Sequence, residues 1–228
     1  LRGSMDASRY KDYMLGLMFY KFLSDKTLET FKETAGLDNI IEEELIKEYN
    51  NAYVEYGDDL EKMIQDILGY YVAPKHLYHT WVSDINNGNF EVQKVIDSLN
   101  HFERSIASSS EADDFEGLFS SSNLDLTNTA LGNNLNERNK NIKALILLFA
   151  DLNMVKLQKG DILGDAYEYL IAQFAMESGK KAGEFYTPHQ VSEVMAQIVA
   201  KTTKLESIYD PTVGSGSLLL TVKKHLDK

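Results

Sequence analysis

The sequence predicts a mainly α-helical protein, in which an all-α domain is followed by the start of an α/β part. Apolar residues recur with the helical period in almost every segment, and alternating, strand-like runs are almost absent. The exception is Leu205 to Tyr209, a β-like run that precedes a glycine-containing turn and an apolar run from Leu218 to Leu226. We place the boundary at Gly160, with a helical domain over residues 1–158 and the α/β part over residues 159–228.

Charge is unevenly distributed between these two parts. Residues 1–158 hold 15 Lys/Arg and 26 Asp/Glu, a net charge of −11, out of −12 for all 228 residues. An acidic surface does not attract a phosphate backbone, so this domain is not expected to grip DNA by itself. The alternative is that the acidity serves only solubility.

Composition also limits the class of protein. The chain has no cysteine, which excludes disulfides and thiolate metal sites, and 43% of its residues are hydrophobic, enough for a buried core. No apolar run approaches 18 residues, and the first residues lack a signal-peptide pattern, so neither a membrane span nor a secreted protein is expected. We expect a cytoplasmic protein.

Within the N-terminal domain, the helical period predicts a series of helices. The expected helices are Asp6 to Ser24, Asp38 to Tyr56, Asp58 to Tyr71, Phe90 to Ala107 and Leu135 to Leu152, with Gly57 dividing the second from the third. A further helix is expected from Asp161 to Glu177, at the start of the second part.

One stretch between these helices raises the question of a metal site. His76 and His79 lie close to Trp81, but no cysteine or nearby carboxylate pair accompanies them. We therefore predict no metal site, and interpret residues 76–81 as a short extended segment near the core.

The glycine-containing turn is the first candidate site. It reads Asp210-Pro-Thr-Val-Gly-Ser-Gly-Ser-Leu218 between a predicted strand and a predicted helix. Gly214 and Gly216 allow positive φ and close approach of a ligand to the backbone. The free N–H groups of the following helix can bind a carboxylate, and Asp210 can face a cation. A ligand with both a carboxylate and an ammonium would suit the turn, although a turn that binds nothing fits the glycines equally well.

A second motif precedes the turn by about two dozen residues. It reads Gly183-Glu-Phe-Tyr-Thr-Pro-His189, in which Thr187 suits an N-cap and Pro188 the first helical position. A helix is therefore expected from Pro188, with its apolar face formed by Val191, Val194, Met195, Ile198 and Val199. Phe185 and Tyr186 could line a pocket or form a hydrophobic staple. Residues 178–182 are interpreted as a linker, with a mobile gate as the alternative.

Together, the two motifs resemble the modification (M) subunits of type I restriction-modification systems. Further segments resemble the family in the same order: Leu1 to Asp6, Tyr10 to Leu17, Glu137 to Asn139 and Gly160 to Tyr169. Members of this family are DNA adenine-N6 methyltransferases that use S-adenosyl-L-methionine, so the resemblance implies a Rossmann-like methyltransferase domain after the helical domain. It also implies that Leu1 is not the natural N-terminus.

The resemblance assigns cofactor-binding roles to both motifs. Asp210 would face the ammonium of the cofactor's methionine part, and Gly214, Ser215, Gly216 and Ser217 would shape the loop around it. The opposite wall would consist of Glu184, Phe185, Tyr186, Thr187, Pro188 and His189, with a solvent-facing His189 as the alternative. No residue is assigned to catalysis and none to a metal.

The family's catalytic element, Asn-Pro-Pro-aromatic, is expected after the glycine loop. The three prolines of this chain, Pro74, Pro188 and Pro211, are not adjacent, and the sequence continues only one helix beyond the loop. We therefore expect a fragment that is inactive alone. The alternatives are an acidic docking module without chemistry, or a methyltransferase acting on protein or RNA.

By resemblance, the partners would be a DNA-specificity subunit, a restriction subunit, a second modification subunit and, in the assembled complex, double-stranded DNA. No membrane is expected among them. Because the family reads its target sequence through a separate subunit, these residues do not specify it.

Overall fold

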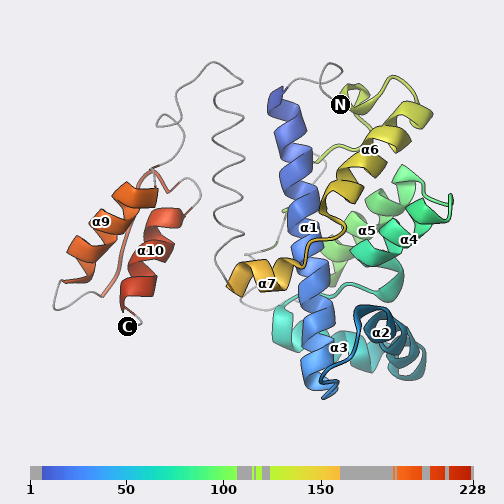
Figure 1. Ribbon diagram of the computed structural model, residues 1–228, viewed down its shortest axis with the longest axis horizontal. Coiled ribbons are helices and arrows are strands. Elements are labelled where there is room, and N and C mark those ends of the chain that lie inside the picture. Colours follow the sequence, from blue (N-terminus) through green and yellow to red (C-terminus); the bar gives the residue numbers. More distant parts are fainter. Residues whose placement is uncertain are drawn as a thin grey trace. The chain divides into compact units, whose positions relative to one another are not determined.

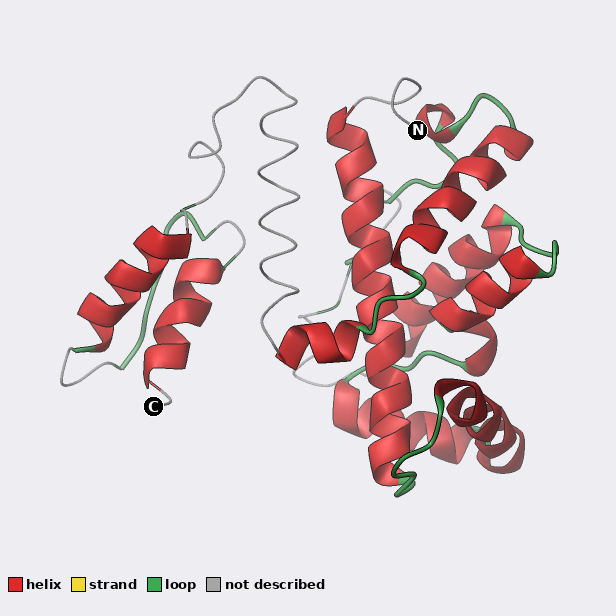
Figure 2. Ribbon diagram, in the orientation of Figure 1, coloured by secondary structure: helices red, strands yellow, loops and turns green. Residues whose placement is uncertain are grey.

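The computed structural model describes residues 7–106, 115, 117–119, 124–159, 187, 189–201, 206–213 and 216–226. The chain divides into two compact units, Leu1–Gly160 and Asp161–Lys228, which are considered one at a time. All regular elements of the described ranges are helical (Figure 2), as the sequence predicts for the first unit.

The first unit is built around α1, which spans Ala7–Thr34 and contacts α2, α3, α4, α6 and α7 (Figure 1). It is longer than predicted because Leu28 and Phe31 continue the buried stripe beyond Ser24. Gly36 then ends the helix with a φ of +65°, and Leu37 N donates to Lys32 O at 3.0 Å, a typical helix-terminating bond.

Two acidic helices follow as a hairpin. The helix α2 spans Glu42–Tyr56 and α3 spans Asp58–Leu68, joined by Gly57 at a φ of +48°. The predicted division at Gly57 is confirmed, although α2 begins four residues later than expected. Leu45 and Tyr49 face inward on α2, where the ring of Tyr49 lies 5.1 Å from that of Phe31.

The next elements pack aromatic side chains against α1. They are the short 3-10 helix η1 (Pro74–His76), α4 (Tyr78–Asn86) and α5 (Val92–Ser105). The expectation of an extended segment over residues 76–81 is wrong from Tyr78 onward. Aromatic residues favour strands only weakly, and helix α4 lets Trp81 stack on Tyr20 with ring centroids 4.6 Å apart. Tertiary packing therefore decides the conformation.

The first unit ends with η3 (Thr129–Leu131), α6 (Leu135–Phe149) and α7 (Met154–Lys159). A capping box starts α6: the Asn134 side chain accepts from Glu137 N at 3.0 Å, and the Glu137 carboxylate accepts from Asn133 N at 2.8 Å. The predicted helix over residues 135–152 is confirmed except for its last turn. The helix expected over residues 161–177 lies outside the described residues.

In the second unit, α9 (His189–Ala200) and α10 (Ser217–Leu226) lie side by side. Figure 1 shows both helices starting at the same end of the unit, with residues 206–210 returning between them. The strand expected at Leu205 to Tyr209 is not formed over the described residues 206–209, and Leu205 lies outside them. A strand needs a neighbour for its backbone groups, and no described segment pairs with this one.

The packing of α9 also differs from the prediction. Ser192 and Ala196 are its buried residues, and Thr221 and Val222 are buried on α10. The larger residues expected on the buried face, Val191, Val194, Met195 and Ile198, are 42–66% exposed. Among the described residues, small side chains rather than this apolar face form the contact between the helices.

Candidate functional site

The glycine loop begins with a turn built on Asp210. Its Oδ1 accepts hydrogen bonds from Thr212 N at 2.9 Å and from Thr212 Oγ1 at 3.2 Å, an Asx turn that reverses the chain after the extended segment. These bonds use only one of the two carboxylate oxygens. The half-buried Asp210 is therefore fixed in orientation, and among the described residues its other oxygen has no hydrogen-bond donor.

Gly216 connects this turn to α10. Its N donates to Val213 O at 2.7 Å, and its carbonyl accepts from Leu220 N at 3.0 Å, the first helical bond. Its φ of +75° favours glycine, and a Cβ placed there would meet no atom within 4 Å. The space beside Gly216 is therefore open at the helix end, where backbone N–H groups can bind an anion.

The first motif is described only in part. Thr187 precedes α9 in a non-helical, half-exposed position, and His189 is the first residue of the helix. Glu184, Phe185, Tyr186 and Pro188, together with Gly214 and Ser215 of the glycine loop, lie outside the described residues. Since α9 and α10 start at the same end of the unit, Thr187 and His189 lie at the same end as Gly216 and Ser217 (Figure 1).

Contacts within the unit keep this arrangement together. His225 Nε2 lies 2.7 Å from Glu193 Oε1 and links the end of α10 to α9. Ser192 Oγ is buried without a hydrogen-bond partner among the described residues. Close packing of small side chains and this histidine–carboxylate contact therefore both join the two helices.

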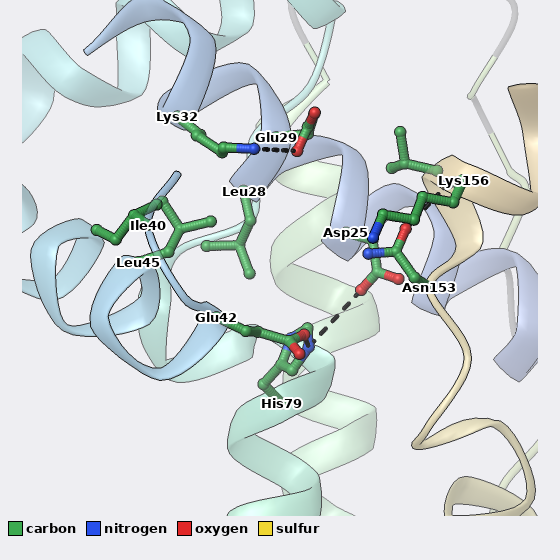
Figure 3. Close-up of a pocket in the computed structure, with 11 residues that line it drawn as sticks. Asp25, Leu28, Glu29, Lys32, Ile40, Glu42, Leu45, His79, Asn153 and Lys156 are labelled. Atoms are coloured by element: carbon green, nitrogen blue, oxygen red, sulfur yellow. Dashed lines mark hydrogen bonds and ion pairs between the residues drawn. The ribbon is translucent and has the colours of Figure 1, made fainter. Parts of the chain in front are cut away.

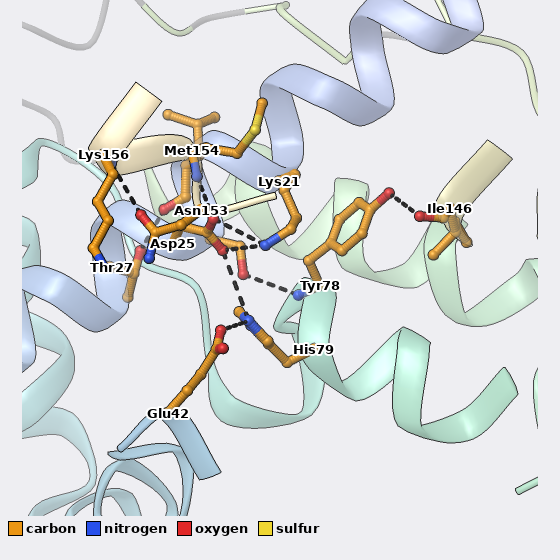
Figure 4. Close-up of polar contacts among 12 residues, drawn as sticks. Lys21, Asp25, Thr27, Glu42, Tyr78, His79, Ile146, Asn153, Met154 and Lys156 are labelled. Atoms are coloured by element: carbon orange, nitrogen blue, oxygen red, sulfur yellow. Dashed lines mark hydrogen bonds and ion pairs between the residues drawn. The ribbon is translucent and has the colours of Figure 1, made fainter. Parts of the chain in front are cut away.

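A second polar cluster, which no sequence motif indicated, lies inside the first unit (Figure 4). Lys21 Nζ donates to both carboxylate oxygens of Asp25, at 2.8 and 2.9 Å, and the side chains are 1% and 8% exposed. Met154 N donates to Asp25 Oδ2 at 3.1 Å and anchors α7 to α1. Burial raises the pKa of Asp25, and the charge and hydrogen bond of Lys21 oppose that shift.

His79 extends the cluster to two more helices. Its Nε2 forms a hydrogen bond with Glu42 at the start of α2 and lies 3.9 Å from Asp25 Oδ1. This hydrogen bond is the main reason why the pKa of Glu42 is lowered. The cluster thus connects α1, α2, α4 and α7. A lysine and an aspartate four residues apart in an otherwise apolar stretch of helix were the available sequence signal.

A cavity of about 290 Å³ lies beside this cluster (Figure 3). Its lining is Asp25, Leu28, Glu29, Lys32, Ile40, Glu42, Leu45, His79, Asn153, Val155 and Lys156. Each of three carboxylates has a partner: Lys21 for Asp25, a hydrogen bond with His79 for Glu42 and, at 3.7 Å, Lys32 for Glu29. These carboxylates are already engaged by neighbouring side chains, so the cluster acts as a polar brace between the helices.

The histidines considered for a metal site take part in separate contacts. His76 is buried, and its Nδ1 lies 2.9 Å from Ser98 Oγ, while His79 faces the carboxylates described above. Burial, with His101 as the next contribution, lowers the pKa of His76 to about 4. No cluster of three or more metal-ligating side chains occurs among the described residues.

The comparisons with known proteins agree on both units. The family profile described as the HsdM N-terminal domain matches residues 1–149, and that described as N-6 DNA Methylase matches residues 158–228. These two matches in this order, an HsdM N-terminal domain and then an N-6 DNA methylase domain, define a DNA methylase with a helical N-terminal domain. The chain belongs to the family of methylase subunits of type I restriction-modification systems.

Individual relatives support the same assignment. The chain is 32% identical to the type I restriction enzyme MpnII methylase subunit of Mycoplasma pneumoniae, covering all of this chain and 42% of the relative. It is 26% identical to the MjaIX methylase subunit of Methanocaldococcus jannaschii, again over all of this chain and 38% of the relative.

A solved structure agrees as well. The crystal structure of the type I restriction-modification system methyltransferase subunit from Streptococcus thermophilus matches with a TM-score of 0.82 and 33% identity, covering all of this chain and 47% of the other. The chain thus spans less than half the length of the relatives it matches. Within the described residues, none of the helices is long and apolar enough to cross a membrane.

Proposed function

We propose that the protein to which these residues belong transfers the methyl group of S-adenosyl-L-methionine to the N6 of adenine in DNA, in the cytoplasm. The observation that carries this proposal is the geometry at Gly216. An open space, a positive φ and the N-terminal end of α10 coincide there. The preceding turn holds the carboxylate of Asp210, one oxygen of which accepts no hydrogen bond from the described residues. This combination fits a methionine moiety, which carries both an ammonium and a carboxylate.

We propose that different residues contact different parts of the cofactor. Asp210 would receive the ammonium, while Gly214, Ser215, Gly216 and Ser217 would surround the methionine part and its carboxylate. Glu184, Phe185, Tyr186, Thr187, Pro188 and His189 would form the opposite wall. The cofactor supplies the methyl group, and these side chains bind and orient it.

The test is a pair of matched substitutions in the full-length parent protein. Gly216→Asp fills the open space and places a carboxylate against that of the cofactor, so at least a hundredfold loss of affinity is expected. Gly88→Asp is the control, because Gly88 has the same φ of +75°, also has open space where a Cβ would lie, and belongs to a turn of the first unit. Calorimetry measures cofactor affinity, and equal affinity of the two variants would contradict the assignment.

The 228 residues alone are proposed to be inactive, since they contain no Asn-Pro-Pro sequence to hold a flipped adenine. Purified chain, labelled cofactor and adenine-containing duplex are incubated with and without the specificity subunit. Methylation above background would overturn this proposal. Transfer to cytosine by the parent protein would contradict adenine as the target.

For the first unit we propose docking within a complex that contains a DNA-specificity subunit, a restriction subunit, a second modification subunit and double-stranded DNA. Its net charge of −11 over residues 1–158 supports a protein-docking role over phosphate binding. Titration of this chain with duplex DNA at low salt should show little binding. In a pull-down, the same chain should capture the purified specificity subunit. Tight, steeply salt-dependent DNA binding by the chain alone would contradict the proposal.

The alternative function, an acidic docking module without chemistry of its own, makes a different prediction for the parent. Gly216→Asp would then leave assembly unchanged, and the unmodified parent would show no methyl transfer at all.

A further inference from the structure

The two parts of the candidate cofactor site are held on separate helices. The first motif leads into α9 at His189, and the glycine loop leads into α10 at Ser217. Because both helices start at the same end of the unit (Figure 1), the distance between the two walls of the site depends on the position of α10 along α9. A contact that fixes this position therefore also sets the shape of the site.

The packed surface between the helices does little to fix their position. Its buried residues are Ser192 and Ala196 on α9, and Thr221 and Val222 on α10. Such small side chains lack the large, interdigitating knobs that specify one register in a pair of helices. Ser192 Oγ adds no direction, since it is buried without a hydrogen-bond partner among the described residues.

His225, near the end of α10, supplies a directional link. Its Nε2 lies 2.7 Å from Glu193 Oε1, and because an ionised carboxylate only accepts, the imidazole donates. The two side chains are 18% and 38% exposed, so water competes for the bond only in part. Gln197 Nε2 donates to the same oxygen at 3.0 Å and holds the Glu193 side chain from its own helix. The bond therefore defines one position of α10 along α9.

The same side of α10 leads from this bond to the glycine loop. Ser217, Thr221 and His225 follow one another at intervals of four residues, so they lie on one side of the helix. Thr221 Oγ1 donates to Ser217 O at 2.7 Å. On α9, Glu193 lies one turn after His189. The bond between His225 and Glu193 thus joins the two helices along sides that lead to the site.

We propose that His225 is a positioning residue for cofactor binding, which acts through Glu193 and the placement of α10 along α9. This role rests on the proposed function, because it requires S-adenosyl-L-methionine to bind where the two helices start. Without the bond, the helices adopt several registers, of which one places both walls around the methionine part. The apparent affinity then falls with the fraction of molecules in that register, whereas the chemical step of the bound complex is unchanged.

Calorimetry and steady-state kinetics of the full-length parent protein test this role with a matched pair of variants. His225→Leu removes the donor, so cofactor affinity should fall roughly threefold to tenfold, the range expected for one hydrogen bond. The KM for the cofactor should rise by the same factor, and kcat at saturating cofactor should stay within about twofold. His225→Gln keeps an N–H donor at a similar reach and should restore the affinity. The control is Lys223→Ala, an exposed site two residues away on α10, which should bind the cofactor as the unmodified parent does.

Glu193→Leu tests the bond from its other side. It should weaken cofactor binding about as much as His225→Leu, and the double variant should be no weaker than either, because both changes remove the same bond. The role of His225 would be overturned by unchanged affinity of His225→Leu, by a lower kcat at constant KM, by additive losses in the double variant, or by a Gln variant as weak as the Leu variant. A parent protein that binds no S-adenosyl-L-methionine would instead contradict the proposed function, and this role with it.

Discussion

In the unit Leu1–Gly160 the largest fully buried side chains are aromatic, whereas the buried residues on the two described helices of Asp161–Lys228 are small. Trp81, Tyr20 and Tyr49 are among the largest fully buried side chains of the first unit. In the second unit, Ala196 and Ser192 are buried while Ile198 is 66% exposed. The same helical period thus produces a core in one unit and an exposed apolar face in the other.

The difference shows what patterning does and does not specify. A period identifies which side of a helix is apolar, but burial also requires a partner of matching shape and size. In the first unit, α1 is that partner for five other helices, and tyrosine hydroxyls add bonds between distant segments, such as Tyr78 to Ile146 O at 2.8 Å. Among the described residues of the second unit, only the small residues find a partner.

The largest effect is expected from opening the buried ion pair of the first unit. Asp25→Ala leaves the ammonium of Lys21, 1% exposed, without a carboxylate, and should lower the free energy of unfolding by about 3–5 kcal/mol. Urea titration followed by the fluorescence of Trp81, the one tryptophan of the chain, reports on this unit alone. The double variant Lys21→Met with Asp25→Leu should recover most of the loss, and an equally unstable double variant would contradict the explanation.

A smaller effect is expected from acid. Burial holds the pKa of His76 at about 4, against 6.5 for a free histidine. Between these pH values the unfolded chain takes up a proton that the folded chain does not, so the free energy of unfolding should fall by about 2–3 kcal/mol as pH is lowered from 6.5 to 4. In His76→Asn, the same fluorescence-monitored titrations should give a flatter dependence on pH. Asp25 titrates in both proteins and cancels from the comparison, so parallel curves would exclude His76 as the source.

The smallest effect is expected on the outer face of α9. Val194→Glu, at a site that is 59% exposed, should change stability by less than about 0.5 kcal/mol, because it alters no buried contact. Ala196→Glu, two residues along the helix and fully buried, should separate α9 from α10. Hydrogen exchange of peptides from both helices measures the effect, and similar exchange rates for the two variants would show that the contact is not the one described.

Much of the first unit could be predicted from its sequence, because α1, α2, α3, α5 and α6 have regular apolar stripes, and several of them have clear end signals. Gly57 divides α2 from α3, and Asn134 with Glu137 starts α6, as local chemistry dictates. The segment from Tyr78 to Trp81 could not be predicted, because its conformation depends on Tyr20, which is distant in the sequence. The Lys21–Asp25 pair was missed for a related reason: burial of a charged pair depends on residues from other helices.

For the candidate site, the sequence predicted the local turn and the helix starts better than the strand next to them. The turn at Asp210, the positive φ of Gly216 and the start of α9 at His189 follow from the motifs. The strand before the turn does not form in the described residues, because backbone pairing depends on a neighbour that a local pattern does not reveal. The cofactor-binding roles of these residues stay predictions.

The bond from Met154 N to Asp25 joins residues 129 positions apart and has a consequence for protein synthesis. The longest helix of the unit is made first, yet its contact with α7 forms only after residues 154–159 have left the ribosome. At a synthesis rate of about 5–20 residues per second, on the order of ten seconds pass between the synthesis of α1 and that of α7. During that interval Lys21 and Asp25 can pair with each other, four residues apart, while the apolar surface beneath α7 stays uncovered. We therefore expect nascent chains that end near position 149 to bind chaperones, and chains that extend well past position 160 to be released.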